Sequence, residues 1–383
     1  MLRSSVRFPQ AVKRPFLLAA LSLAALTVCA ATTPNPNESP KPGEVPKSKL
    51  GERADKLIVE GLPVCSEPST EKISFADLQH KLPPNLDGQV IRIESPRQSC
   101  AGQWVAVTSA TGDFFLGIPW FLDDVKGTPD QKVKSFGWNA LQQNIDSTID
   151  KQPNHDGFFN VAITETTESG RMPMQAEMDP NASVLFIGHF HPENADFRES
   201  RLKYFQPFIN QSPVTGAAKP VVTIIEFSDF ECPSCKYASD HDYAQKIVDA
   251  HPDQVRYIRY DLPLVTMHPW AFAAAVAGRA IYRQKPELFW DYKKQVYANQ
   301  EQLSAFTIDD FAKHFAADHD LDMKKYAADL NSDEIKASIL AGAGTAFSND
   351  VRATPTYMVN GTMVDAGDDG KFLASYVAGL LKK

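Results

Sequence analysis

The segment EFSDFECPSC, residues 226–235, continues the apolar run PVVTIIEF (220–227). The β-branched and apolar residues of that run predict a buried strand. Pro233 suits the first turn of a helix, because a missing N–H does little harm there. The two cysteines, Cys232 and Cys235, are therefore expected at the point where a strand gives way to a helix.

This placement favours thiol chemistry at Cys232. A cysteine at the amino end of a helix lies near free backbone N–H groups and the positive end of the helix dipole, which both stabilise its thiolate. Cys235 lies one helical turn further on, close enough to resolve a mixed disulfide formed by Cys232. Asp229 and Glu231 would raise the pKa of Cys232 if they pointed at it, and Lys236 could offset them.

The Cys-Pro-Ser-Cys motif has two other interpretations. A structural zinc site needs four Cys or His ligands, and no second such motif is present. An inert structural disulfide is the other alternative. The strand, motif and helix in this order favour redox chemistry, and no metal site is predicted.

The sequence downstream alternates between strands and helices. A strand is predicted at QVRYIRYDL (254–262), helical segments over about 269–347, and a final amphipathic helix at 370–383. Between the last two, TPTYMVNGTMV (354–364) carries Asn-Gly between apolar runs, a strong signal for a type I′ hairpin. The order is therefore β, α, β, a helical block, a hairpin and α.

The chain resembles a known family. EFSDFECPSC (226–235), followed far downstream by ATPTYMVNG (353–361), looks like the DsbA-like branch of the thioredoxin superfamily. The helical block is similar to the helical insertion of that branch. The resemblance covers about residues 215–383 and implies an α/β, thioredoxin-like fold, with Cys232 as the exposed nucleophile and Cys235 as the buried resolving thiol.

The same resemblance implies a substrate-binding surface and a proton carrier. Pro355 would be a cis-proline, leaving the backbone of Thr354 free to pair with an extended substrate, and Pro233 and Ser234 are assigned to the same surface. Glu226 would move protons for the buried cysteine. From the residues alone, an ordinary strand-entry proline and a glutamate reaching solvent stay open as alternatives.

The N-terminus carries a targeting signal. Residues 1–30 combine a basic head with a short apolar run and small residues, which predicts a secretory signal peptide and export, for example to a periplasm. The run is short for a membrane-spanning helix, which needs roughly 20 residues. A lipoprotein acylated at Cys29 and a retained anchor are the alternatives. Residues 31–59, whose first part is rich in Pro, Asn, Ser and Lys, are predicted to be a flexible linker.

Residues 60–194 are predicted to form a β-rich α+β domain, whose fold and role the sequence does not name. A short helix is expected from Ser74, and the strand-like runs are 89–95, 104–109, 114–119, 158–166 and 183–190. A linker helix and loop are expected over 195–218, before the C-terminal domain at 219–383. Disulfide isomerases of the DsbC and DsbG type also carry an N-terminal domain joined by a linker helix, so a homo-oligomer through this domain stays open.

The remaining cysteines and two histidines are further candidates. Without Cys29 the chain keeps four cysteines, and an even count in an exported protein suggests two pairs. Cys65 and Cys100 would form a structural disulfide worth roughly 3–4 kcal/mol in the chain-entropy model, or a second redox centre. His189 and His191 would share one face of a strand. A copper or zinc site there lacks an evident third ligand, so partly exposed strand histidines are favoured.

Charge and chemistry together define the expected function. The net charge is −8, and it becomes −12 when the four basic residues of the signal peptide are removed from the 39 that oppose 47 acids. This balance argues against nucleic-acid binding. The prediction is an enzyme, an exported thiol:disulfide oxidoreductase that forms or isomerises disulfides in protein substrates. It would need no cofactor beyond its dithiol and would be recycled by a membrane redox partner. The alternatives are a disulfide reductase or redox chaperone, and a redox-inert protein that binds a partner through its N-terminal domain.

Overall fold

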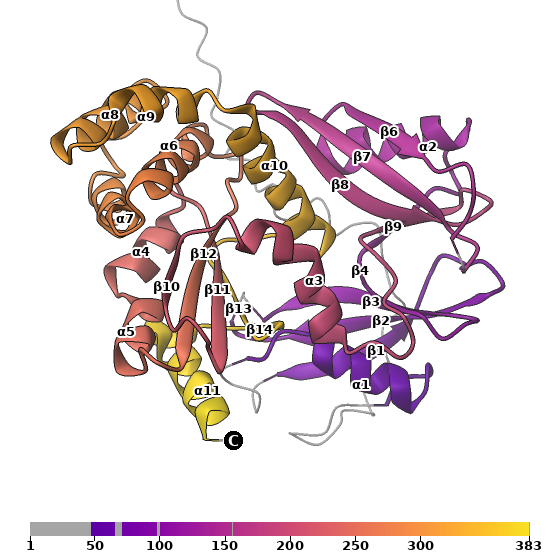
Figure 1. Cartoon of the computed structure of the whole chain (residues 1–383). Helices are drawn as coiled ribbons and strands as arrows, with labels where there is room; N and C mark the ends of the chain where they lie inside the picture. Colours follow the sequence, from indigo (N-terminus) through magenta and orange to yellow (C-terminus); the bar gives the residue numbers. More distant parts are fainter. Residues whose placement is uncertain (1–46, 66–70, 98–99, 155, 383) are drawn as a thin grey trace, which may run out of the picture. The chain divides into compact units, whose positions relative to one another are not determined.

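A computed structural model describes residues 47–65, 71–97, 100–154 and 156–382. The predicted signal peptide, the alternative acylation site at Cys29 and the linker up to residue 46 lie outside the described residues. All described residues belong to one compact unit. Figure 1 shows their helices and strands.

The C-terminal region is built around a five-stranded sheet of order β10-β12-β11-β13-β14 (Figure 1). β11 runs parallel to β12 and antiparallel to β13, and the other neighbouring pairs are antiparallel. The strands are β10 (Val214–Gly216), β11 (Val222–Ser228), β12 (Val255–Asp261), β13 (Thr356–Val359) and β14 (Thr362–Val364). The expectation that 195–218 holds only a helix and a loop is wrong at β10, because its backbone pairs with the edge of β12.

Helices cover both faces of this sheet because neighbouring residues of β11 point to opposite sides. Ile224 packs with α5 (Tyr243–Ala250) and α11 (Lys371–Leu381). Ile225 packs with α3 (Phe197–Ile209) and α10 (Asp333–Ser348). Two layers of helices thus enclose a mixed sheet, as expected for the α/β class.

The helical block lies where the sequence predicts it. Its helices are α6 (Ala271–Gln284), α7 (Leu288–Ala298), α8 (Ile308–Asp318), α9 (Met323–Leu330) and α10. Apolar residues of these helices form one core with Cys232 and Cys235. The helix predicted after Cys232 is interrupted, since α4 (Pro233–Asp240) and α5 are separated by Asp242, whose φ is 50°. The insertion therefore packs directly against the cysteine motif.

The N-terminal region is β-rich, as predicted, and contains two antiparallel sheets of orders β1-β2-β3-β4 and β5-β9-β8-β7-β6. Its helices are α1 (Glu52–Gly61), α2 (Pro129–Phe136) and the π-helix Gly137–Leu141. Its strands are β1 (Lys72–Asp77), β2 (Leu86–Glu94), β3 (Gly102–Ser109), β4 (Phe114–Gly117), β5 (Pro119–Phe121), β6 (Ile145–Ile149), β7 (Phe159–Thr167), β8 (Gly170–Met178) and β9 (Val184–Ile187).

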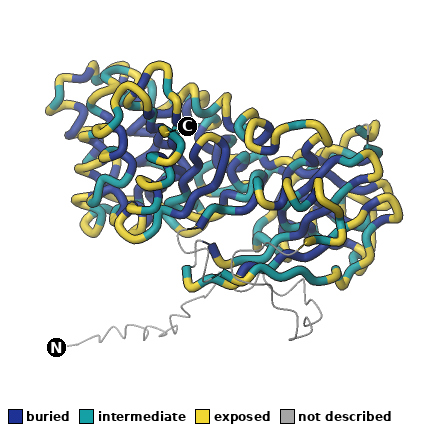
Figure 2. Tube along the Cα trace, turned by 90° about the horizontal axis from the view of Figure 1, so that it is seen from below, coloured by how far each residue is buried: buried dark blue, intermediate teal, exposed yellow. Residues whose placement is uncertain are grey.

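Two expectations for this region are wrong. The segment from Ser74 is a strand rather than a helix, because β1 pairs along its whole length with β2. The range 31–59 is not linker throughout, because α1 begins at Glu52 and buries Leu57 and Ile58 in the core of the first sheet. In Figure 2 the buried positions lie mainly inside the fold and the exposed positions mainly on its outside.

Polar contacts join the two regions. The guanidinium of Arg201 on α3 is buried and donates to the carbonyl oxygens of Gly61 and Gly361. The backbone N–H of Gln175 on β8 donates to the hydroxyl of Ser348 on α10, over 2.9 Å. The boundary predicted between the regions stays a prediction, since these contacts cross it.

Candidate active site

The strand–loop–helix that carries Cys-Pro-Ser-Cys places its two thiols as predicted from the motif. Cys232 is the N-cap residue of α4, Pro233 occupies the first turn, and both Pro233 and Ser234 are exposed. Cys235 is fully buried, and Cys232 is only 7% exposed. The expectation of an exposed nucleophile is therefore wrong in degree, because Cys232 Sγ lies 3.3 Å from the carbonyl oxygen of Thr354 and is partly covered by that loop.

The two thiols differ sharply in acidity. The pKa of Cys232 falls to about 6, chiefly through a hydrogen bond from the Cys235 thiol and further through the side chain of Thr354 and the backbone N–H groups of the first helical turn, which together outweigh burial. The pKa of Cys235 is raised well above its ordinary value by burial and by the neighbouring Cys232. At neutral pH Cys232 is thus a thiolate able to attack a disulfide, while Cys235 keeps its proton.

The peptide bond between Thr354 and Pro355 is cis, and the carbonyl oxygen of Thr354 lies 3.3 Å from Cys232 Sγ. Both residues are half-buried and lie just before β13. Pro233 and Ser234 are exposed and follow Cys232 in the first turn of α4. The assignment of these four residues to a substrate-binding surface stays a prediction.

Glu226 is buried on β11 and does not reach solvent, in contrast to the open alternative. One carboxylate oxygen, Oε2, accepts a hydrogen bond of 2.7 Å from the hydroxyl of Tyr257 on β12. The other, Oε1, has no hydrogen-bond partner among the described residues. The charge of Glu226 is near enough to contribute to the raised pKa of Cys235.

Sequence reasoning missed two members of this network, Tyr257 and Lys293. Burial and the adjacent Glu226 raise the pKa of Tyr257, so its hydroxyl keeps a proton to donate. The ammonium of Lys293 on α7 donates to that hydroxyl over 3.2 Å, and burial lowers the pKa of this lysine. The sequence does contain a signal for the burial of Lys293. This residue lies four positions from both Phe289 and Tyr297, which are buried, and so belongs to the buried face of its helix.

The charged neighbours of Cys232 all have hydrogen-bond or ion-pair partners. The carboxylate of Asp229 accepts hydrogen bonds from backbone N–H groups and from His268. Glu231 accepts from the backbone N–H of Trp270. Lys236 pairs with Asp240 along α4, so it does not serve Cys232 as the offsetting charge that the sequence suggested.

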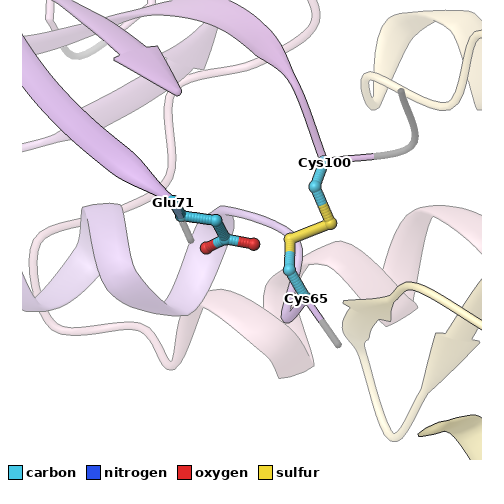
Figure 3. Close-up of side chains that lie close together, drawn as sticks. All are labelled: Cys65, Glu71 and Cys100. Carbon is cyan, nitrogen blue, oxygen red and sulfur yellow. A yellow bond between two sulfur atoms is a disulfide. The ribbon is translucent and has the colours of Figure 1, made fainter. Parts of the chain in front are cut away.

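The other two cysteines, Cys65 and Cys100, are joined by a disulfide with an S–S distance of 2.06 Å and a Cα–Cα distance of 6.0 Å. The carboxylate of Glu71 points toward this bond (Figure 3). The two sulfurs and a carboxylate oxygen lie within 4.8 Å of one another, but the sulfurs are bonded to each other and so do not act as metal-binding thiolates. Burial, then the charge of Asp365, raises the pKa of Glu71.

The expectation that His189 and His191 are partly exposed on one face of a strand is wrong, because β9 ends at Ile187 and His191 is buried. His191 is buried and shares a 2.9 Å hydrogen bond with the hydroxyl of Ser200, and burial lowers its pKa to about 3. His189 stacks on Tyr204, and its Nδ1 lies 3.7 Å from a carboxylate oxygen of Glu177. The group of possible metal ligands found among the described residues contains neither histidine.

Known proteins resemble parts of this chain. The family model described as Thioredoxin matches residues 209–377. Disulfide bond formation protein D of Bacillus subtilis is 27% identical over 165 residues, which cover 42% of this chain and 72% of that protein. The Na(+)/H(+) antiporter NhaA 3 of Salinispora tropica is 32% identical over 148 residues, 39% of this chain. The chain spans only 21% of the length of that antiporter.

Among solved structures, oxidised BdbD from Bacillus subtilis matches with a TM-score of 0.41 and 21% identity, over 46% of this chain and 95% of that one. Among the described residues, no helix combines the length and the apolar character needed to cross a membrane.

These findings bear on the fold of the C-terminal domain. It is similar to the family described as Thioredoxin over residues 209–377, and the thioredoxin-like α/β fold expected from the sequence is confirmed. The expected resemblance to DsbA-like thiol:disulfide oxidoreductases, which are enzymes, is confirmed for this domain.

Proposed function

We propose that the chain is an exported thiol:disulfide oxidoreductase that forms or isomerises disulfides in protein substrates through Cys232 and Cys235. The observation that carries the proposal is the opposite displacement of the two thiol pKa values, to about 6 for Cys232 and upward for Cys235. A stabilised thiolate favours the reduced form of the pair, which makes the oxidised pair an effective oxidant.

In the oxidising direction the pair starts as a disulfide. A substrate thiolate attacks Cys232 Sγ, the Cys232–Cys235 bond breaks, and Cys235 leaves with the bonding electrons and takes up a proton. A second substrate thiolate then attacks the substrate sulfur of the mixed disulfide and releases the Cys232 thiolate. The substrate gains a disulfide and the enzyme becomes the dithiol, which a membrane redox partner would reoxidise.

The surrounding residues take supporting roles in this proposal. Glu226 would deliver a proton to Cys235 and accept it in the reverse step, because its carboxylate is buried, its charge contributes to the raised pKa of that thiol, and one of its oxygens has no hydrogen-bond partner among the described residues. Thr354 and Pro355 would align an extended substrate segment beside Cys232, with Pro233 and Ser234 contacting it.

Isomerisation would use the same thiolate. Cys232 would attack a wrongly paired substrate disulfide, and a substrate thiolate would later displace it, so that the substrate changes partners without net oxidation. In this proposal an oligomer would form through the N-terminal region, about 60–194, and its linker helix.

The test combines a reduction potential with a trapping experiment. Cys235→Ala should accumulate a mixed disulfide between Cys232 and a reduced, unfolded model substrate, and the wild-type pair should equilibrate with glutathione at an oxidising potential. A strongly reducing potential of the Cys232–Cys235 pair would indicate a disulfide reductase instead. If the pair fails to cycle between dithiol and disulfide, the remaining function is that of a redox-inert binding protein. Repair of a scrambled substrate by a dimer or trimer would select isomerisation over oxidation.

A further inference from the structure

His268 lies outside the cysteine motif, in the loop between β12 and α6, and no role was assigned to it above. Its side chain is half-buried, with 16% of its surface exposed, and its Nδ1 lies 2.8 Å from Asp229 Oδ2. Asp229 follows β11 directly and comes three residues before the nucleophile Cys232. The imidazole is thus fixed by a residue of the loop that carries the nucleophile.

The carboxylate of Asp229 connects His268 to Cys232. Its Oδ1 accepts from the backbone N–H groups of Glu231 and Cys232, over 2.6 and 3.2 Å. Its Oδ2 accepts from the backbone N–H of Leu264 as well as from His268. Because this carboxylate is buried and has four donors, both the loop before Cys232 and the imidazole are held in fixed positions around it.

The backbone of Asp229 also contacts the second thiol. Its N–H points at Cys235 Sγ over 3.5 Å, and its carbonyl oxygen accepts from the hydroxyl of Tyr297. One residue therefore contacts the nucleophile, the resolving thiol and the histidine.

We infer that His268, held by Asp229, is a positioning residue that supplies the positive charge for the Cys232 thiolate from outside the Cys-Pro-Ser-Cys motif. The inference rests on the proposed function, and it names the source of a charge that the motif lacks. Pro233 and Ser234 are uncharged, and Lys236 is paired with Asp240. The histidine supplies this charge from the loop of a different strand.

The charged groups that face His268 favour its protonated form. The hydrogen bond to Asp229 is the main cause of the raised pKa of His268, and the charges of Asp229, Cys232 and Glu231 add to it against the effect of burial. Since the attraction between imidazolium and thiolate is mutual, loss of the imidazolium should raise the pKa of Cys232.

The first test replaces His268 with asparagine, which keeps an N–H donor near the position of Nδ1 and removes the charge. The matched control is His319→Asn, because His319 is also half-buried and its Nδ1 is 2.8 Å from a carbonyl oxygen, that of Phe315. The measurement is the pH dependence of thiolate absorbance and of alkylation rate at Cys232 in the reduced enzyme.

We expect the midpoint for Cys232 to move up by about 0.5–1 pH unit in H268N and to stay near 6 in H319N. Equal midpoints in the two variants would overturn the inference. This titration needs no disulfide transfer. If the Cys232 midpoint shifts in H268N but the wild-type protein transfers no disulfides, the proposed function is rejected and the interaction between His268 and Cys232 stands. If the wild type transfers disulfides normally but the midpoint does not shift, only the interaction between His268 and Cys232 is rejected.

A reciprocal measurement leaves His268 unchanged. The imidazole NMR signal of His268 is titrated in the reduced wild-type enzyme and in Cys232→Ser. The midpoint for His268 should fall in Cys232→Ser, because the thiolate that favours the imidazolium is gone. An identical midpoint in the two proteins would contradict the inference even if H268N does not fold.

Discussion

The chain contains two cysteine pairs whose surroundings are opposite in kind. Cys232 lies at the amino end of α4, where backbone N–H groups, the Cys235 thiol and Thr354 stabilise its thiolate. The Cys65–Cys100 disulfide lies in the β-rich region, and the carboxylate of Glu71 points toward it (Figure 3). A helix N-terminus favours a thiolate, whereas a neighbouring carboxylate disfavours one.

The environment, rather than the presence of two sulfurs, separates an exchanging pair from a structural one. Burial does not distinguish the two pairs, because Cys232 is 7% and Cys65 5% exposed, and Cys235 and Cys100 are both fully buried. Cys232 is instead followed by the exposed Pro233 and Ser234 and carries a free thiol, whereas Cys65 and Cys100 are bonded to each other. The N-terminal pair is therefore expected to act on stability and the C-terminal pair on chemistry.

The largest expected effect comes from breaking the C-terminal pair. Cys232→Ala removes the thiolate that attacks and leaves, so disulfide transfer to a reduced model substrate should fall to the uncatalysed background. The double variant Cys65→Ala/Cys100→Ala is the matched control. It should retain the rate of disulfide transfer within about twofold, because it leaves both Cys232 and Cys235 in place. If both variants lost transfer equally, the division of labour between the pairs would be rejected.

The second effect is on stability and belongs to the N-terminal pair. Removing the bridge between Cys65 and Cys100, which are 35 residues apart, should lower the free energy of unfolding by about 3–4 kcal/mol in the chain-entropy model. Denaturant unfolding of Cys65→Ala/Cys100→Ala measures this directly. Cys232→Ala/Cys235→Ala, in which both free thiols are removed, should show a much smaller loss. The opposite ranking would mean that the bridge carries no stabilising role.

Local patterns made much of the C-terminal fold predictable. The two-residue turn at Asn360 and Gly361 has positive φ at both positions, 47° and 84°, as the Asn-Gly signal for a hairpin requires. The strand–motif–helix around Cys232 was predictable for the same reason, because each of its features depends on a few neighbouring residues. The N-terminal sheets were harder, since β8 carries Met, Pro and Gln and is held by pairing with β7 and β9.

The site was predictable only in its motif residues. Asp229 and His268 are 39 residues apart, and Glu226 and Tyr257 are 31 apart, so each contact forms only once β11 and β12 lie side by side. Lys293 joins the second group from the helical insertion. No periodic pattern in the sequence encodes such pairings, because the packing of distant elements brings them about.

The third prediction compares one carboxylate near each cysteine pair. Glu226→Gln removes the proposed proton carrier beside Cys235 and should slow resolution of the Cys232 mixed disulfide by about 10²-fold. The lifetime of the mixed disulfide, followed by quenching and gel mobility, measures the effect. The alkylation midpoint of Cys232 should stay near 6, because Glu226 Oε2 is hydrogen-bonded to Tyr257 and Oε1 has no hydrogen-bond partner among the described residues, so neither oxygen contacts Cys232. A shifted midpoint with an unchanged lifetime would assign Glu226 to the nucleophile instead.

The smallest effect is expected for the other carboxylate. Burial raises the pKa of Glu71 above 4.5, so this group favours folding fully below that pH, and the contribution is lost as the pH rises through its folded-state pKa. Glu71→Gln does not ionise. Its stability relative to the wild type should therefore be lowest below pH 4.5 and should increase toward neutral pH.

The change should be about 0.5 kcal/mol or less, because Glu71 is partly exposed and solvent screens its charge. Denaturant unfolding below pH 4.5 and at neutral pH measures it, and Glu71→Gln should leave disulfide transfer unchanged. A loss of relative stability toward neutral pH would reveal a favourable contact of the ionised carboxylate. In that case Glu71 would support the Cys65–Cys100 bridge through its charge, and the contrast between the two cysteine environments would rest on Cys232 alone.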